Sequence, residues 1–589
     1  MAALEFQTRR RGMVCPALFE MFQIVSGYGK PHPYGFGASS EIRQAVPTLY
    51  LNFAMMTGRT PGRKLISAVG CIAFAAISLR AQVTAPGDDV ARETMKFARI
   101  YQIVQQNYVD PADPDRLVLE SGVRGMLASL DPFSSFFDRD QFKALEQENS
   151  GEILGFGSIL SVQPGRVMVL QAQQGSPSWR AGLGPGDEIV AVNGVQLDTL
   201  GVRGLVALLE KTRSHPARLS VLHPGEAAPE DFRLMPAQVA LPTVDIAFRY
   251  SSGIGYLHIT SFESKTPQEV RSALRKLGAN SLKGLVLDLR DNPGGALDSA
   301  VQVCGFFLKP ASVVLTMRGR AVPERTYRTE PAPLAVTTPL VVLVNRRTVS
   351  AAELVAAALQ DHDRAIIAGE PTFGKGVVES VMPLSDETAL GLVTAEYFTP
   401  SGRSVQRPLA GTALQHSSRV LEASGRDPAA SKSVTFYTDD GRTVTAHGGV
   451  TPDVQLPATH LDPWLRFLNQ TGMFSSFASA YFAYHGKIDK TFEPTPQTLE
   501  EFRNYLAAQR IQSPEPYWSK DQQYLGSSIR AALFNLAFGL DYGNEIATLN
   551  DPQVQAAASL FPDVPDLLHR PSSRGPYARN PAPLQPTRN

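Results

Sequence analysis

The spacing of apolar residues changes along the chain and divides it into regions of different structure. Between residues 93 and 109, apolar side chains recur every three or four positions, which predicts an amphipathic helix. A second helix is predicted over residues 118–130, where Asp131 and Pro132 stop it. We therefore expect a helical region over residues 90–150, with packing or dimerisation as its role.

Residues 152–238 show a different pattern. Short apolar stretches alternate with turns that contain Gly, Pro and Asp, and one helix is predicted at residues 201–211. Short strands separated by frequent turns are typical of a small β-rich domain.

Residues 239–460 alternate between strand and helix patterns. Continuous apolar runs at 284–290 and 339–345 are typical of buried strands. Helical patterns follow them at 296–308 and 350–360. This alternation predicts a mixed sheet covered by helices.

The remainder of the chain is predicted to be helical and then disordered. Residues 461–565 have mostly helical patterns, whereas residues 566–589 are rich in Pro and Arg with few large apolar side chains. The expected fold class is thus α/β multidomain. It comprises a helical N-terminal region, an embedded β-rich domain, a mixed α/β core over 239–460 and a helical C-terminal extension.

Composition limits the classes of function. A chain of 589 residues is too long to fold around a single hydrophobic core, so two to four domains are expected. With 56 basic and 56 acidic side chains the net charge is zero, which gives no support for a nucleic-acid partner. The three cysteines, Cys15, Cys71 and Cys304, are too few for a disulfide framework or a cysteine metal cluster. No metal ion or organic cofactor is implied.

An apolar segment near the amino end predicts export. Residues 65–79 carry no charge and lie between Lys64 and Arg80, with the length of a secretory signal's apolar region. We expect residues 55–82 to be a signal peptide or a membrane anchor, and residues 1–54 to be an artefact of start assignment. Export places the protein in the periplasm or cell envelope, with membrane association through 65–79. A buried helix is the alternative interpretation of this segment.

The stretch GEPTFGKG, residues 369–376, begins like a phosphate-binding loop. That motif requires Ser or Thr after the lysine, because the hydroxyl ligates Mg²⁺. Gly376 takes this place, so a nucleotide site is not favoured and Lys375 needs another explanation.

Ser350 lies where the buried strand 339–345 is followed by the helix 350–360. At such a junction a hydroxyl is exposed at the sheet edge, and the next backbone N–H groups can stabilise an oxyanion. The alternative is local, since Ser350 and Glu353 have the spacing of a helix capping box.

Lys375 favours the catalytic interpretation of Ser350. It follows Ser350 by 25 residues, after one helix and one strand, which can return the chain to the same end of the sheet. Burial among uncharged residues favours the neutral amine of a lysine, which can accept a serine proton. A solvated turn residue is the alternative for Lys375 alone.

The β-rich region resembles a PDZ domain. The resemblance rests on GFGSIL at 155–160 and on GSPSWRAGLGPGDEIVAVNGV at 175–195. It implies that an extended peptide binds as an added strand, with its terminal carboxylate held by the loop of Gly155, Phe156 and Gly157. A tight turn that requires glycine is the alternative.

A wider resemblance covers residues 93–460. The motifs DLRDNPGG (288–295), TVSAAELVAAALQDHDRAIIAGEPTFGKGVVES (348–380), EYFTPSGRSVQ (396–406) and GGVTPDV (448–454) resemble the carboxy-terminal processing peptidases, a serine protease family. The resemblance implies Ser350 as nucleophile and Lys375 as general base. It also implies an oxyanion hole formed by the backbone N–H of Ala351 and that of either Gly294 or Gly295.

Two positions near the site differ from the family or have an open role. Where the family often has a glutamine four residues after the lysine, this chain has Glu379, which would favour a charged Lys375 if it is ionised and close. Asp361 matches an acid found in some members, or it is simply a helix-end residue.

The predicted function is a serine endopeptidase that binds apolar C-termini of protein substrates through its PDZ domain and cleaves extracytoplasmic proteins. Residues 461–565 are expected to shape the substrate entrance or to contact another subunit of a homo-oligomer. One alternative is a PDZ-bearing adaptor on an inactive protease scaffold. Another is a Ser–His–Asp hydrolase, for which His362 is the nearest histidine.

Overall fold

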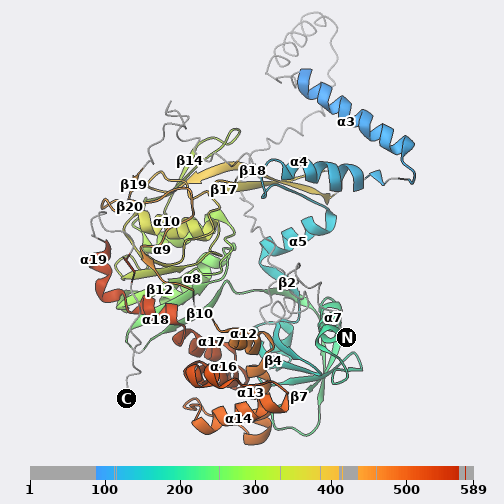
Figure 1. Ribbon diagram of the computed structural model, residues 1–589, viewed down its shortest axis with the longest axis vertical. Helices are drawn as coiled ribbons and strands as arrows, with labels where there is room; N and C mark the ends of the chain where they lie inside the picture. Colours follow the sequence, from blue (N-terminus) through green and yellow to red (C-terminus); the bar gives the residue numbers. More distant parts are fainter. Residues whose placement is uncertain are drawn as a thin grey trace, which may run out of the picture. The chain divides into compact units, whose positions relative to one another are not determined.

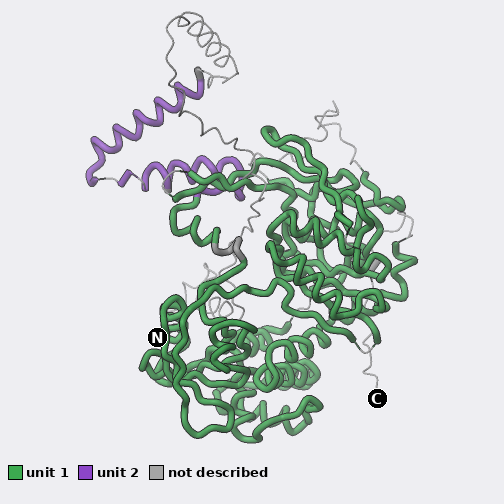
Figure 2. Tube along the Cα trace, turned by 180° about the vertical axis from the view of Figure 1, so that it is seen from behind, with its two compact units in different colours: residues 1–38, 137–589 green, residues 39–136 purple. Residues whose placement is uncertain are grey.

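The computed structural model describes residues 88–568, except 112, 115, 251, 332, 385–386, 410–413, 415–434 and 459–460, together with residues 577–578. The predicted signal segment 55–82 and the predicted start artefact 1–54 lie outside these residues. The chain forms two compact units, of which one contains residues 39–136 and the other contains the chain from residue 137 onward (Figure 2).

The described part of the N-terminal unit is mostly helical. It contains α3 (Asp88–Asn107), η2 (Arg116–Val123) with π-helical hydrogen bonding, and α4 (Arg124–Ala128), so both predicted helices are present. The apolar stripe of α3 is exposed. Its members are Val90, Phe97, Ile100 and Ile103, each at least half exposed.

A seven-stranded sheet forms the centre of the larger unit. Its order is β10-β11-β12-β15-β16-β21-β22, with β10 antiparallel to β11 and the other neighbours parallel. The strands are β10 (Val244–Arg249), β11 (Ile254–Ile259), β12 (Gly284–Asp288), β15 (Leu340–Val344), β16 (Ile366–Gly369), β21 (Val454–Gln455) and β22 (Tyr577–Ala578). This is the mixed sheet that the strand and helix patterns predict.

Helices cover both faces of this sheet (Figure 1). On β15, Val342 and Val344 pack with α8 (Thr266–Leu277), α9 (Leu297–Phe307) and α10 (Ala351–Asp361). The alternate residues Val341 and Leu343 pack with α18 (Pro552–Ala558) and with Val564, the first residue of α19 (Val564–Leu568). Successive strand residues point to opposite faces, so a continuous apolar strand needs both layers.

The C-terminal helices therefore belong partly to the core. α18 contacts β12 and β15, and α19 contacts β16, so the end of the predicted helical extension completes the α/β/α layers. α19 continues to Leu568, which makes residues 566–568 helical and corrects the predicted start of the disordered tail. The rest of that tail, apart from 577–578, lies outside the described residues.

An antiparallel sheet lies beside the central one. Within it β18 (Ala389–Phe398) pairs with both β17 (Val377–Pro383) and β13 (Val313–Arg318), and β13 also pairs with β14 (Arg325–Arg328). β13 also contacts α10. This sheet places β17 and β18 near the N-terminus of α10, where Ser350 lies.

The β-rich region is a sheet with two helices. The sheet order is β3-β4-β5-β7-β8, with β6 added beside β5. Its elements are β3 (Ser158–Gln163), β4 (Arg166–Ala172), α6 (Pro177–Arg180), β5 (Glu188–Val192), β6 (Val195–Gln196), α7 (Val202–Thr212), β7 (Ala217–Leu222) and β8 (Glu230–Leu234). β2 (Glu152–Gly155) pairs with β9 (Ala237–Ala240) and joins this region to the core.

The helices α12–α16 pack around aromatic side chains and against the β-rich region. They are α12 (Pro463–Gln470), α13 (Met473–His485), α14 (Pro496–Ala508), α15 (Glu515–Lys520) and α16 (Gln522–Phe538), followed by α17 (Leu540–Leu549). Their hydrophobic cluster includes Met168 and Leu170 of β4, both almost fully buried. One apolar core therefore joins β4 to the C-terminal helices.

Candidate active site

Ser350 occupies a strained position between β15 and α10. Its φ angle is +54°, which is unusual for a residue with a side chain. The turn before it is held by neighbouring strands, because the Thr348 hydroxyl donates to the Leu289 carbonyl and the Val349 N–H donates to the Asn292 carbonyl. A strained conformation fixed by its surroundings is a feature of functional sites.

Lys375 lies in the loop between β16 and β17, in a segment where glycine is required. Gly374 has φ +94°, and a Cβ there would lie 2.9 Å from the Cβ of Arg407. A Cβ on Gly376 would lie 2.7 Å from the backbone nitrogen of Gln406. The glycines of the sequence GKG thus allow the loop to pack against residues 406–407 and bury Lys375 to 2% exposure.

Glu353 connects the loop of Lys375 to the start of α10. One of its carboxylate oxygens accepts the N–H of Ser350 at 2.9 Å and the N–H of Lys375 at 2.8 Å. The other accepts the hydroxyl of Thr372 and the N–H of Gly374. Burial raises the pKa of Glu353 to about 7, against these hydrogen bonds, which favour the ionised form. The sequence predicted only the local contact with Ser350.

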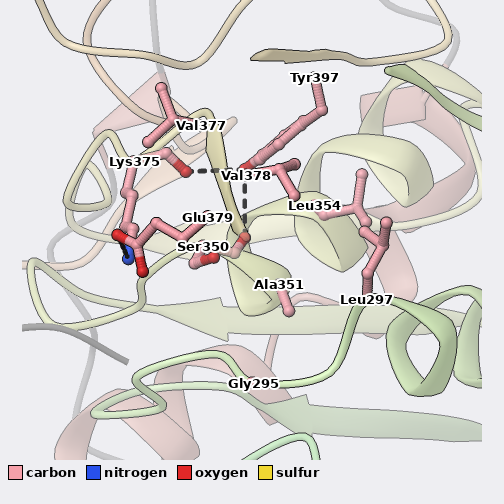
Figure 3. Close-up of a pocket in the computed structure, with 10 residues that line it drawn as sticks. All are labelled: Gly295, Leu297, Ser350, Ala351, Leu354, Lys375, Val377, Val378, Glu379 and Tyr397. Carbon is pink, nitrogen blue, oxygen red and sulfur yellow. Dashed lines mark hydrogen bonds and ion pairs between the residues drawn. The ribbon is translucent and has the colours of Figure 1, made fainter. Parts of the chain in front are cut away.

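Tyr397 of β18 makes a second connection between the same two residues. Its hydroxyl lies 3.1 Å from the carbonyl oxygen of Ser350 and 3.0 Å from that of Lys375, so one donor serves both (Figure 3). Burial and the charge of Glu353 raise the pKa of Tyr397 well above its usual value, which keeps the hydroxyl protonated. Sequence reasoning missed this residue, although a buried tyrosine needs a partner for its hydroxyl.

Ser350, Lys375 and Glu379 line one small pocket. Its other lining residues are Gly295, Leu297, Ala351, Leu354, Val377, Val378 and Tyr397. The cavity volume is about 30 Å³, which is room for only one or two water molecules. Figure 3 shows the Lys375 nitrogen beside the Glu379 carboxylate, and the distance from Nζ to Oε1 is 2.9 Å.

One of the two glycines in the NPGG turn, residues 292–295, lines the pocket. The N–H of Gly294 donates to Oδ1 of Asn292 at 2.8 Å, so it is already used within the turn. Gly295 lines the pocket and has φ +134°, where a Cβ would lie 2.1 Å from the carbonyl oxygen of Phe262. The geometry therefore favours Gly295 over Gly294 as the partner of Ala351 in an oxyanion hole.

Asp361 and His362 are not brought to this pocket. They lie at the opposite end of α10, about 16 Å along the helix from Ser350. Asp361 pairs with Arg403 at 2.8 Å, with both side chains fully buried. Both ring nitrogens of His362 are engaged, one by Asp439 and the other by the carbonyl of Val313. These contacts give both residues a structural explanation.

A cluster of charged residues lies next to the NPGG turn in the structure. Arg290 pairs with Asp288 of β12 at 2.6 Å and with Asp551, the N-cap of α18, at 2.8 Å. Tyr256 donates to Asp288 at 2.7 Å. Burial opposes ionisation of Asp288, but the charge and hydrogen bonds of Arg290 hold its pKa below the usual range. No local pattern in the sequence indicates that Arg290 joins Asp288 to Asp551, which lies far along the chain.

The predicted peptide-binding loop has unused donors. The carbonyls of Phe156 and Gly157 accept hydrogen bonds from Ser178 and Gln173. Within the described residues, the N–H groups of Phe156 and Gly157 have no acceptor. Gly157 has φ +78°, and its Cβ would lie 2.2 Å from that of Ser176, so glycine is required there. Gly155 ends β2 and pairs with Ala237.

Comparison with known proteins gives three matching family models. Residues 253–413 match peptidase family S41, residues 168–222 match the PDZ domain, and residues 75–141 match the activating protease CtpB N-terminal domain. A carboxy-terminal-processing protease of Bartonella bacilliformis is 34% identical over 54% of this chain and 73% of that protein. The chain belongs to the carboxy-terminal processing proteases of peptidase family S41.

A second curated carboxy-terminal processing protease gives the same result. The carboxyl-terminal-processing protease of Synechocystis sp. is 32% identical over 52% of this chain and 72% of that protein. Among solved structures, the photosystem II D1 C-terminal processing protease is 26% identical, covering 62% of this chain and 93% of that one with a TM-score of 0.33. The predicted family, its serine peptidase activity and the predicted fold class, including the PDZ domain, are confirmed.

Proposed function

We propose that this carboxy-terminal processing protease uses Ser350 as nucleophile and Lys375 as general base, and that it cleaves extracytoplasmic proteins whose apolar C-termini bind its PDZ domain. One observation carries the proposal. Ser350 and Lys375 line the same buried pocket, and their backbone N–H groups donate to one oxygen of Glu353.

The chemistry proposed for this pocket is acyl transfer. Neutral Lys375 removes the hydroxyl proton as Oγ of Ser350 bonds to the substrate carbonyl carbon. The N–H groups of Ala351 and Gly295 stabilise the resulting oxyanion. The ammonium of Lys375 then returns the proton to the leaving amine. Water attacks the acyl-enzyme with Lys375 again acting as base, which releases the product and restores Ser350.

The PDZ domain supplies the proposed recognition of C-termini. A substrate adds as a strand beside β3, and its carboxylate binds the N–H groups of Phe156 and Gly157. Half-buried apolar side chains on β3 and α7, Leu160, Val206 and Leu209, provide an apolar surface for the last side chain. An amidated C-terminus should therefore raise KM without changing kcat, compared with the free acid of the same sequence.

The proposal that the protein is exported to the periplasm or cell envelope rests on residues 55–82, the predicted signal peptide or membrane anchor. Within the described residues, no helix is long and apolar enough to span a bilayer. The test is N-terminal sequencing of the native protein in separated cell fractions. A start at or after residue 83 in the periplasmic fraction indicates a cleaved signal, and an intact 65–79 in the membrane fraction indicates an anchor. Recovery from the cytoplasm, or any peptide from residues 1–54, would contradict the proposal.

Cleavage of an unfolded reporter with an apolar C-terminal tag tests the roles of Ser350 and Lys375. We expect turnover by the wild-type protein and none by Ser350→Ala or Lys375→Ala. Both variants should still bind the tag, because the PDZ domain is unchanged. Turnover that survives in Ser350→Ala would exclude Ser350 as the nucleophile.

The ion pair between Lys375 and Glu379 supports a second candidate function, an inactive adaptor that binds C-termini without cleaving them. A protonated lysine cannot act as a base. Binding of the tag by the wild-type protein without turnover at any pH would favour the adaptor.

A further inference from the structure

Lys375 and Glu379 are in direct contact in the candidate active site, at a position where the family resemblance led us to expect a glutamine. The two side chains are four residues apart and only 2% exposed each. Their Nζ to Oε1 distance of 2.9 Å is that of a close ion pair. The pair lies in the pocket of Ser350, so it bears directly on the reaction proposed above.

The backbone of Lys375 is fixed on both sides. Its N–H donates to Glu353 and its carbonyl accepts from Tyr397. Any change in the position of the nitrogen must therefore come from the four-carbon side chain alone. In this structure that side chain extends to Glu379 (Figure 3).

Charged groups come near the loop of Lys375 from several elements. Glu379 is on the adjoining strand β17, Glu353 comes from α10, and Glu396 lies on β18 opposite Val377. The guanidinium of Arg407 is directed to the carbonyls of Thr372 and Phe373 at the far side of the loop. The hydroxyl of Tyr397 stays protonated and neutral. The Glu379 carboxylate contacts the Lys375 nitrogen, and the other side chains that line the pocket carry no charge.

This environment favours the ammonium form of Lys375. A glutamine at position 379 would accept a hydrogen bond from an amine or from an ammonium, with no net charge to discriminate between them. A carboxylate prefers the ammonium by its Coulomb attraction, which burial strengthens. An ammonium has no lone pair and cannot accept the proton of Ser350.

We propose that Glu379 is a positioning residue that holds Lys375 in its protonated form in the resting enzyme, so that proteolysis begins only after the pair has lost one proton. This inference rests on the proposed function. The proton goes to solvent, and Lys375 then has the lone pair that accepts the hydroxyl proton of Ser350. Two interacting groups that share a proton titrate as a unit, so the rising part of the rate–pH curve reports the pair.

The test compares rate–pH curves of the full chain with Glu379→Gln, using kcat and KM for the tagged reporter between pH 6 and 10. We expect the rising part to move down by about one pH unit or more in the variant. Below both midpoints, kcat should then be about tenfold higher than in the wild type, with KM unchanged. Glu353 is common to both proteins, so its own titration does not enter the difference.

Two further variants keep the comparison interpretable. Glu370→Gln makes the same chemical change in the loop that carries Lys375, but Glu370 pairs with the exposed Arg346 outside the pocket, so its curve should match the wild type. Glu379→Leu removes the charge and every polar atom of the side chain together. It should also move the curve down if the charge is what matters, and it provides a second reading should Glu379→Gln fail to fold.

The outcomes separate this inference from the proposed function. Curves for Glu379→Gln and the wild type that coincide, or a curve that moves up, overturn the role of Glu379. So does folded but inactive protein for both Glu379 variants, which would make the carboxylate necessary. Turnover that persists in Ser350→Ala or Lys375→Ala overturns the proposed function instead. An inactive wild type together with an active Glu379→Gln would show that Glu379 suppresses the base, but it would overturn the proposed proteolysis by the wild-type protein.

Discussion

One carboxylate oxygen of Glu353 accepts the backbone N–H of Lys375 at 2.8 Å, and it also accepts that of Ser350 at 2.9 Å. The residue that begins the helix and the residue in the distant loop are thereby fixed by one buried group. A side chain that looks like a helix cap in the sequence therefore sets the distance between nucleophile and base.

Replacing Glu353 with glutamine should lower kcat with little change in KM. The amide nitrogen would face N–H donors, and each lost hydrogen bond to a charged group is worth about 1.5–3 kcal/mol. We expect a loss of kcat of at least about tenfold, which corresponds to about 1.4 kcal/mol. Reporter kinetics measure it, with Glu370→Gln as the control. Unchanged kcat in a folded Glu353→Gln protein would contradict the positioning role.

Ser350→Gly should be more stable than Ser350→Ala, although both should be inactive. The φ angle of +54° is strained for a residue with a Cβ and is open to glycine. We expect a difference in the free energy of unfolding of about 1 kcal/mol. Urea denaturation of the two variants measures it. Equal stability would show that the strain at residue 350 is negligible.

Asn292→Ala should lower kcat more than it raises KM. The Asn292 side chain accepts the N–H of Gly294 and donates to the carbonyl of Ile259, which fixes the turn that presents Gly295. Loss of one oxyanion donor costs about 10²–10³ in kcat in other serine proteases, so a looser turn should cost a part of this. Steady-state kinetics give the two parameters, and a change confined to KM would point to substrate binding instead.

His258 should make stability depend on pH. Burial opposes its protonation, but the hydrogen bond and charge of Asp245 outweigh this and raise the pKa of His258 to about 9. A raised pKa stabilises the fold fully below the unfolded value of about 6.5, and the effect is lost as pH rises through 9. His258→Gln should thus cost about 3 kcal/mol at pH 6 and almost nothing from this source at pH 9.5.

Urea unfolding of both proteins at pH 6 and pH 9.5 checks this prediction. The variant has no titrating group at position 258, so its stability should differ less between the two pH values. The same stability difference from the wild type at both values would mean that His258 contributes by packing and not by charge.

The exposed apolar stripe of α3 should mediate self-association. Ile100 and Ile103 are each more than half exposed, which is costly for a stable surface helix. Ile100→Glu combined with Ile103→Glu should reduce the mass measured by light scattering to that of one chain. Gln102→Glu adds a charge to the same helix away from the stripe, and it should leave the mass unchanged. A wild-type protein that has the mass of one chain would contradict the prediction of a homo-oligomer.

Local sequence patterns predicted the elements that carry the site. The continuous apolar runs of β12 and β15 indicated buried strands, and the end of β15 placed Ser350 at a strand-to-helix junction. Gly278 directly follows α8 and is left-handed in the structure, as is typical of a glycine that ends a helix. These features depend on neighbours within a few residues, which a sequence shows directly.

The contacts that complete the site are between distant residues and carried no such signal. The spacing of Ser350 and Glu353 shows a capping box, but not that the same carboxylate reaches Gly374 and Lys375. In the sequence, Tyr397 looks like any other strand residue. The sequence of α18 does not indicate which face of the sheet the helix covers. The choice between Gly294 and Gly295 depends on one hydrogen bond from Asn292, which only the folded turn reveals.

The burial of α10, the helix that follows the nucleophile, determines when activity is lost on heating. All eleven residues of α10 are buried, and it lies between the central sheet and β13. Amide hydrogens in such an element exchange with solvent only when the whole domain opens. The nucleophile should therefore keep its geometry until global unfolding, and heating should abolish proteolysis together with the fold and not before it.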